Sequence, residues 1–273
     1  MTKLEYRLTN DTLFKMLFVK YPGLLKKLVA VLLGIMHDSI SQFEIRNPEM
    51  PPESLGDKFC RLDITMTVDG QRIDLEVQVD DEGDYPERSL FNWAREYSNS
   101  LPKGGKYADL PRTVVISIMD FKLFDCAEYH SEFMVLEVNR HTPLTDRLSM
   151  HYFELCKLPQ TVKADNGTEL WLSLFRAKTE EDLAKLEALE VPEMREAISA
   201  YRHVTVTPEF QELERLRTKA RHAEAQALYN AERKAEQKTK FDIAKKMIGR
   251  NRPVDEIIED TGLTLEEVES LRS

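Results

Sequence analysis

The chain of 273 residues contains little cysteine and little histidine, and each shortage excludes a class of site. Its three cysteines, Cys60, Cys126 and Cys156, are widely spaced and include no CxxC pair. This pattern favours reduced, mostly buried thiols of a cytosolic protein over a disulfide framework or a zinc site. The six histidines show no HxxxH or HExxH spacing, so a histidine-based metal centre is disfavoured.

Long apolar runs and an excess of positive charge are also missing. The most apolar run, Leu28 to Met36, is too short to cross a bilayer, and the first residues do not resemble a signal peptide. We therefore expect a cytoplasmic protein with no membrane partner. With 38 Lys and Arg against 48 Asp and Glu, the formal net charge is −10, so any contact with nucleic acid requires a local basic patch.

A tight β-hairpin is the clearest feature that the sequence does contain. Polar and apolar residues alternate from Arg61 to Val68 and again from Gln71 to Val79. Asp69-Gly70 lies between these runs, and this dipeptide is a strong signal for a two-residue hairpin turn. Such a turn places Val68 opposite Gln71 and thereby sets the register of the whole hairpin.

In that register Asp63 lies directly opposite Glu76, with Cβ atoms roughly 4.5–5.5 Å apart. Gln78 falls on the same face, because side chains alternate along a strand. Two opposed carboxylates repel each other unless a cation or a proton relieves the repulsion. A site for a hard metal ion is therefore the first hypothesis.

The two faces of the hairpin differ in character. One is apolar and should pack on helices; it comprises Leu62, Ile64, Met66, Val68, Ile73, Leu75, Val77 and Val79. The other carries Asp63, Thr65, Thr67, Arg72, Asp74, Glu76, Gln78 and Asp80. A solvated face, as antiparallel sheets often have, is one interpretation of the polar set. Its predominantly negative charge favours the metal hypothesis instead.

The remaining patterns predict an α/β core with a central mixed sheet flanked by helices, and a C-terminal helical extension. The expected order is two helices, three strands, a helix and three strands. The second helix is expected from Leu24 to Ile35 after a break at Tyr21-Pro22-Gly23, and the last three strands at Thr113–Met119, Phe133–Val138 and Met150–Leu155. We place the core at residues 1–205 and a long helix with a small tail at residues 206–273.

Four basic residues could contact nucleic acid near the hairpin. Arg88 and Arg95 fall on the polar side of a helix expected from Pro86 to Leu101, opposite Leu90 and its apolar neighbours. Lys103 and Lys106 lie in the glycine-rich loop that follows. A bidentate clamp on a backbone phosphate is one role for the arginines; an exposed polar helix face and a mobile loop are equally consistent with the pattern.

The tail resembles a helix-turn-helix, with Thr264 and Glu267 forming a capping box. A helix that recognises DNA should present Arg, Lys, Asn or Gln. This one presents Leu265, Glu266, Glu267 and Glu269, which favours packing or protein contact. Assembly of the chain with its own copies through the C-terminal helices is left open.

Stretches along nearly the whole chain are similar to the Rpn family of recombination-promoting nucleases and putative transposases, within the PD-(D/E)XK nuclease superfamily. The matching segments are Asp11–Phe18, Arg61–Ile64, Asp74–Gln78, Glu87–Ala94, Tyr107–Ile118, Glu128–His130, Ile243–Met247 and Thr261–Thr264. The resemblance implies a PD-(D/E)XK restriction-endonuclease-like core.

The resemblance also implies residue roles. Asp63 and Glu76 would be metal ligands, with the Val77 carbonyl as a further ligand and Gln78 orienting the attacking water. The superfamily usually has Lys at that third position, and a neutral amide can neither supply charge nor take a proton. Asp11 would complete the metal shell and Lys15 would contact DNA. For Asp11 a simple interaction with its own helix dipole is an equal alternative.

Oxygen ligands alone suit Mg²⁺, with Mn²⁺ or Ca²⁺ as alternatives. The expected function is a metal-dependent DNA endonuclease that promotes recombination or is linked to mobile elements or defence. The alternative is a catalytically weak or inactive protein of the same fold that acts through protein contacts of its C-terminal helices. A DNA-binding regulator is disfavoured by the acidic last helix.

Overall fold

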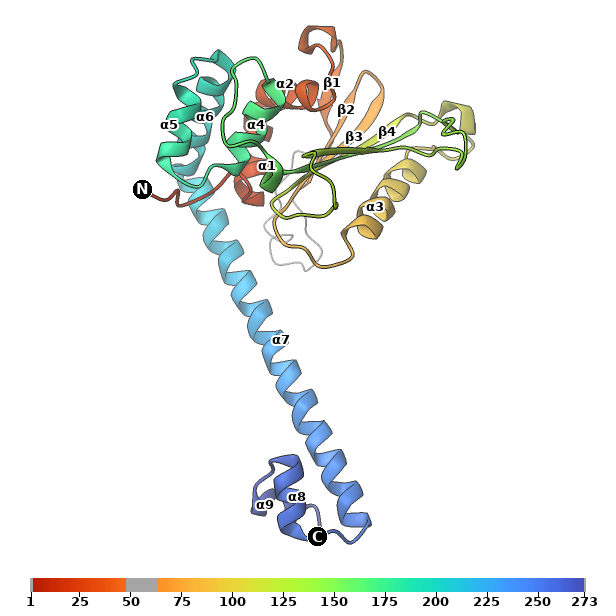
Figure 1. Ribbon diagram of the computed structural model, residues 1–273, viewed down its shortest axis with the longest axis vertical. Coiled ribbons are helices and arrows are strands. Elements are labelled where there is room, and N and C mark those ends of the chain that lie inside the picture. Colours follow the sequence, from red (N-terminus) through yellow and green to blue (C-terminus); the bar gives the residue numbers. More distant parts are fainter. Residues whose placement is uncertain (1, 48–62, 273) are drawn as a thin grey trace. The chain divides into compact units, whose positions relative to one another are not determined.

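The computed structural model describes residues 2–47 and 63–272. Its helices and strands follow the predicted order, with further helices after the last strand (Figure 1). Their bounds are α1 Asp11–Lys20, α2 Pro22–Leu32, β1 Phe43–Ile45, β2 Ile64–Val68, β3 Gln71–Gln78, α3 Tyr85–Asn99, β4 Thr113–Met119, β5 His130–Phe133, β6 Leu148–Glu154, α4 Gly167–Arg176, α5 Glu180–Glu187, α6 Pro192–Thr205, α7 Pro208–Gly249, α8 Val254–Thr261 and α9 Leu265–Ser270. Short 3₁₀ turns occupy His37–Ser39 (η1), Tyr107–Asp109 (η3) and Leu155–Lys157 (η4).

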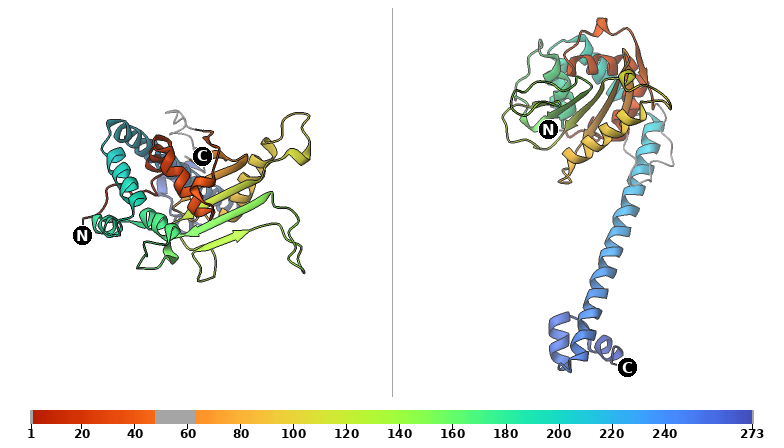
Figure 2. Two further views of the ribbon diagram at one scale, coloured as in Figure 1. Left: turned by 90° about the horizontal axis from the view of Figure 1, so that it is seen from above. Right: turned by 90° about the vertical axis from the view of Figure 1, so that its right-hand side faces the viewer.

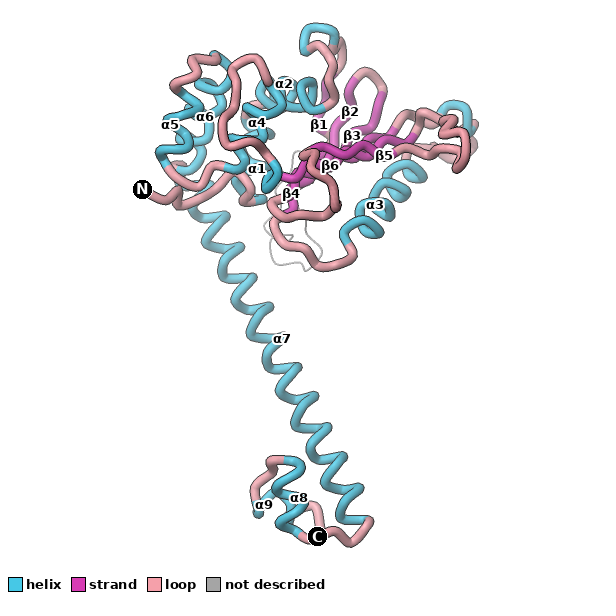
Figure 3. Tube along the Cα trace, in the orientation of Figure 1, coloured by secondary structure: helices cyan, strands magenta, loops and turns pink. Residues whose placement is uncertain are grey.

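The described strands form a sheet in the order β1-β2-β3-β4-β6-β5. β3 pairs with β4 and β4 with β6 in parallel, whereas the other neighbours are antiparallel. The predicted mixed sheet flanked by helices is therefore confirmed. Figure 3 shows that all regular structure after β6 is helical.

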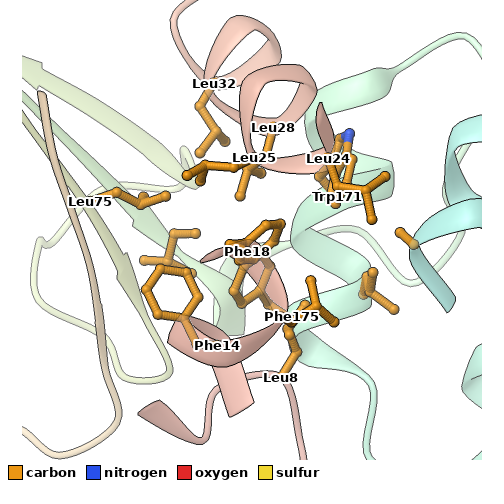
Figure 4. Packing of buried hydrophobic residues seen from close by; sticks show 14 of the residues in the cluster. Leu8, Phe14, Phe18, Leu24, Leu25, Leu28, Leu32, Leu75, Trp171 and Phe175 are labelled. Carbon is orange, nitrogen blue, oxygen red and sulfur yellow. The ribbon is translucent and has the colours of Figure 1, made fainter. Parts of the chain in front are cut away.

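Helices cover both faces of the sheet. α1, α2 and α4 pack on one face, and α3 lies on the other (Figures 1 and 2). The larger core includes Phe14 and Phe18 of α1, Phe175 of α4 and Leu75 of β3, all almost fully buried (Figure 4). This core fixes the hairpin from one side and leaves its polar face toward α3.

Several predicted boundaries are wrong for local reasons. The predicted break between the first two helices is present, because α1 ends at Lys20, but α2 starts at Pro22 and not at Leu24. Pro22 and Gly23 form the first turn of α2, where proline lacks no needed hydrogen bond. The helix stops at Leu32, and Gly34 follows with φ +65°. β5 lies earlier and β6 starts earlier than expected, while β4 has the predicted bounds.

The thiols that the structure describes are not buried. Cys126 and Cys156 are both exposed, so the prediction of mostly buried cysteines is wrong for these two. Cys60 lies outside the described residues. Within the described part of the chain, no helix is long and apolar enough to cross a membrane.

Contacts divide the chain into two units, Met1–Glu214 and Arg215–Ser273. The division falls within α7, beyond the domain boundary predicted at residues 205 and 206. In the second unit, α8 and α9 pack with the end of α7 around a small apolar cluster of Ala244, Ile257, Leu263 and Val268. The predicted capping box of Thr264 and Glu267 is present, and Gly262 ends α8 in the left-handed conformation.

Candidate active site

The hairpin turn has the predicted geometry. Asp69 and Gly70 have φ of 46° and 80°, as a turn with two left-handed residues requires. The Asp69 carboxylate also accepts hydrogen bonds from Ser41 Oγ (2.7 Å) and from the main-chain N–H of Gln42 (2.8 Å), and these bonds lower the pKa of Asp69. The turn is therefore anchored from outside the hairpin.

The register that follows from this turn is confirmed from Val68 opposite Gln71 to Ile64 opposite Leu75. Asp63 directly precedes β2, and continuing the register by one residue would bring it opposite Glu76. The side chain of Asn47 holds this end of the hairpin: it donates to the Asp63 carbonyl and accepts from the Thr65 N–H, both at 2.9 Å.

The polar face is not solvated, so that interpretation is wrong for the middle of β3. Asp74 is 6% exposed and Glu76 3% exposed, because α3 covers them. On the apolar face, Val79 is the exception, with 42% of its surface exposed beyond the end of β3.

Glu76 is held by two hydroxyl groups that the sequence pattern did not single out. Tyr85, the first residue of α3, donates its hydroxyl to Glu76 Oε1 at 2.5 Å. Ser117 faces Glu76 in the parallel β3–β4 ladder and donates to the same oxygen at 3.3 Å. Burial, and then the charge of Glu76, raise the pKa of Tyr85 well above its ordinary value. The Tyr85 hydroxyl therefore keeps its proton near neutral pH and remains a hydrogen-bond donor.

Asp74 lacks this support. Among the described residues its buried Oδ1 has no hydrogen-bond partner. Burial raises its pKa well above the ordinary value, and the negative charges of Asp63 and Glu76 add to the effect, while Arg95 opposes it. Glu96 adds a further negative charge, so the charges that act on Asp74 are predominantly negative.

Gln78 lies on the same face as Glu76, but its amide is engaged. Its Nε2 donates to the Asp80 carbonyl at 2.9 Å. Val77 points to the other face, against the larger core, and lies opposite Ile118 in the ladder. Only its main-chain carbonyl is thus a candidate ligand.

Carboxylate oxygens are suitable ligands for a hard cation, but few carboxylates are available at this site. Across residues 2–47 and 63–272, no three His, Cys, Asp or Glu side chains are grouped so that they could hold a metal ion. A site at Asp63 and Glu76 would need main-chain and water oxygens to complete its shell, as Mg²⁺ commonly does. Asp11, in the first turn of α1 after the N-cap Asn10, is half-buried. The role of Asp11 as a metal ligand stays a prediction, as does its interaction with the dipole of α1.

The basic residues predicted to bind nucleic acid do not gather at one place. Because Arg72 pairs with Thr113 and Gln78 with Met119, the loop carrying Lys103 and Lys106 lies near the start of β3 (Figure 1). Gln78 lies at the other end of that strand, roughly 20 Å away at about 3.3 Å per residue. Both lysines are exposed.

Arg88 is not on an exposed helix face, contrary to the prediction. Its guanidinium lies 4.9 Å from the Tyr85 ring centre and pairs with Glu82, and its side chain is 14% exposed. Leu90, expected on the packed side, is instead 49% exposed. The buried stripe of α3 is centred on Tyr85, Ser89 and Trp93, so it is rotated from the apolar stripe that the sequence indicated.

Arg95 is exposed, as expected. Lys15 is only 4% exposed, in the buried part of α1, so it has little surface for the predicted contact with DNA.

Sequence reasoning also missed a cation beside Gln78. Arg7 Nη1 binds Asp120 Oδ2 at 2.7 Å, and the Asp120 N–H donates to the Gln78 carbonyl at 3.0 Å. No pattern marked Arg7, Tyr85 or Ser117. The available signal was a polar residue, Ser117, within an otherwise apolar strand.

Comparison with known protein families identifies a model that covers most of the chain. The model of a protein family described as PD-(D/E)XK nuclease family transposase matches residues 8–231. Searches of curated proteins and of solved structures gave no match.

Proposed function

Because the chain belongs to the PD-(D/E)XK nuclease family transposases, we propose that it is a metal-dependent DNA endonuclease. The observation that supports the proposal is the β2–β3 register, which ends with Ile64 opposite Leu75. Continued by one residue, this register would bring Asp63 opposite Glu76. A link to recombination, mobile elements or defence rests on the family alone.

In this proposal Asp63 and Glu76 bind a divalent cation, Mg²⁺ in the first place and Mn²⁺ or Ca²⁺ as alternatives. Asp11 and the Val77 carbonyl are the further candidate ligands. When bound, such an ion lowers the pKa of its water and neutralises charge that develops on the phosphate. Gln78 orients the attacking water through its amide and takes no proton from it.

Arg88 and Arg95 are the proposed phosphate contacts on the α3 side. Among the described residues, Arg88 Nε and Nη2 are buried without a hydrogen-bond partner, although Nη1 pairs with Glu82. A guanidinium with one edge still unused can donate hydrogen bonds to a phosphate oxygen there once the surroundings open. Lys103 and Lys106 could add only contacts away from the cut, and Lys15 has little exposed surface for any contact.

Plasmid nicking tests the proposal. Wild type is compared with Asp63→Asn and Glu76→Gln in Mg²⁺, Mn²⁺ and Ca²⁺, with Glu44→Gln as the control. Glu44 is an exposed carboxylate on β1 of the same sheet. Nicking that is lost in both site variants and kept in the control supports the nuclease; nicking that survives in both site variants refutes it.

A protein that has kept the fold without strong catalysis is the second candidate. Gln78 lacks the charge of the usual lysine, and the second unit exposes Ile243 and Leu265, at 42% and 52%. These apolar side chains suit protein contact through the C-terminal helices, with a copy of the chain or another partner. Absence of nicking by wild type in every metal would favour this function.

A further inference from the structure

Tyr85 joins the helix that covers the site to the acidic strand beneath it. It is 0% exposed, and its hydroxyl donates to Glu76 Oε1 at 2.5 Å. The two residues lie nine positions apart and belong to different elements, β3 and α3. The position of the Glu76 carboxylate is therefore tied to the first turn of α3.

The Tyr85 ring is fixed from several sides. It packs edge-on against Phe121 and Tyr152, with ring centres 6.0 and 6.2 Å away, and Arg88 lies over its face. Phenylalanine could make these same contacts. Compared with phenylalanine, tyrosine adds only the hydroxyl, and this hydroxyl donates its hydrogen bond to Glu76.

The chemistry of the donors suits a metal ligand. Tyr85 and Ser117 are neutral, so their hydrogen bonds orient the carboxylate without cancelling its negative charge. An Arg or Lys in their place would compete with a cation for that charge. Both bonds converge on Oε1, which restricts rotation of the group and so fixes where Oε2 lies.

We infer that Tyr85 is a positioning residue of the proposed metal site: its hydroxyl holds Glu76 in the orientation in which the carboxylate binds a divalent cation. The inference rests on the proposed function. Groups that orient a metal ligand in this way typically contribute about 10- to 100-fold to metal affinity. Tyr85 touches neither the metal nor DNA in this role.

The test measures Mn²⁺ affinity by isothermal titration calorimetry on the full chain without DNA. Tyr85→Phe removes the hydroxyl and keeps the ring. Tyr152→Phe is the matched control. It also removes a buried tyrosine hydroxyl from the same apolar cluster, but this hydroxyl is hydrogen-bonded to Ser89 Oγ at 2.6 Å. We expect Tyr85→Phe to weaken Mn²⁺ binding by about 10-fold or more and Tyr152→Phe to leave it nearly unchanged.

A second readout separates positioning from packing. If Tyr85 orients Glu76, higher Mn²⁺ should restore most of the nicking rate of Tyr85→Phe, so that the metal concentration for half-maximal rate rises far more than the maximal rate falls. A loss of folded protein would instead lower the maximal rate and would not be rescued by metal.

Each result decides the matter. Equal Mn²⁺ affinity in Tyr85→Phe and wild type overturns the inference and leaves the nuclease proposal standing, as does an equal loss in both tyrosine variants. Wild type that binds no Mn²⁺ overturns both proposals. Should Tyr85→Phe fail to fold, Ser117→Ala removes the other donor to Oε1; it should weaken binding less, by about threefold, and no change would contradict the inference.

Discussion

Both faces of the β2–β3 hairpin are buried at the middle of β3, but burial has opposite effects on stability on the two faces. Ile64, Met66, Ile73 and Leu75 are at most 2% exposed and pack into the larger core. On the other face, Asp74 and Glu76 are as deeply placed but carry acidic groups. Burial of apolar surface stabilises the fold, whereas burial of carboxylates costs free energy.

This difference indicates that the face with Asp74 and Glu76 has a function other than stabilising the fold. Glu76 has hydroxyl donors, but Asp74 has a raised pKa and an oxygen without a partner among the described residues. Strained ionisable groups of this kind concentrate at functional sites. Substitutions on the two faces should therefore have opposite signatures.

The largest expected effect lies on the apolar face. Leu75→Ala should lower the free energy of unfolding by about 3 kcal/mol, because it opens a cavity in a fully packed core. Urea unfolding monitored by circular dichroism measures it. A loss below about 1 kcal/mol would show that this face is not the structural one.

On the acidic face, Glu76→Gln should reduce nicking by at least about 100-fold, about 2.7 kcal/mol in barrier, because it removes a proposed ligand charge. The same variant should unfold near the wild-type urea midpoint, since the amide retains the shape and can still accept from Tyr85. If Glu76→Gln lowered folding stability as much as the nicking rate, the proposed difference in role between the two faces would be contradicted.

Asp74→Asn should make the protein more stable, by on the order of 1 kcal/mol at pH 7 without metal. Burial raises the pKa of Asp74, so stability falls as pH rises from its unfolded value near 3.9 toward the folded value. The amide has no charge to bury. Urea midpoints in EDTA at pH 5 and pH 8 should show a larger gain at the higher pH; a loss at both would mean that the ionised group is stabilising.

His151 is a buried ionisable residue on the apolar side of the sheet, where it lies beside Ile116 in the ladder. Burial lowers its pKa to about 4; Glu132 opposes this shift, and His130 and Arg112 add to it. The unfolded chain therefore binds an extra proton below about pH 6.5. Stability should be complete above that pH and decline toward pH 4.

Chemical denaturation at pH 7 and at pH 5 checks this expectation. His151→Gln should flatten the dependence, whereas His203→Gln, at an exposed histidine of α6, should not. If the pH dependence of stability were unchanged in His151→Gln, other titrating groups would be its cause.

The smallest effect is expected far from the acidic face. Lys103→Gln with Lys106→Gln should change nicking by less than about twofold at about 0.15 M salt, because this loop lies at the opposite end of β3 and exposed charges are screened at that ionic strength. Arg88→Gln should cost more than the double variant. The reverse order would indicate that DNA crosses the start of β3.

The sequence was enough for the hairpin because alternation and Asp69-Gly70 leave a single register, as the pairing of Val68 with Gln71 shows. It was not enough for α3. There the apolar stripe suggested Leu90 inward and Arg88 outward, but Tyr85 and Ser89 bond to polar groups beneath the helix and rotate it. Hydrophobic periodicity does not register such polar packing.

Long-range contacts were out of reach for a similar reason. Ser117 and Glu76 are 41 positions apart, and Arg7 and Asp120 are 113 apart. The parallel ladder brings Ser117 to Glu76, and the segment before α1 brings Arg7 to Asp120. The ligand and water-orienting roles of Asp63, Glu76 and Gln78 stay predictions.

Mn²⁺ binding to the full chain without DNA tests the central claim most directly. Calorimetric titration should detect binding in wild type, and Asp63→Asn and Glu76→Gln should each weaken it by at least about 10-fold, while Glu44→Gln binds as wild type does. Wild-type affinity in both site variants would contradict a cation shared by Asp63 and Glu76.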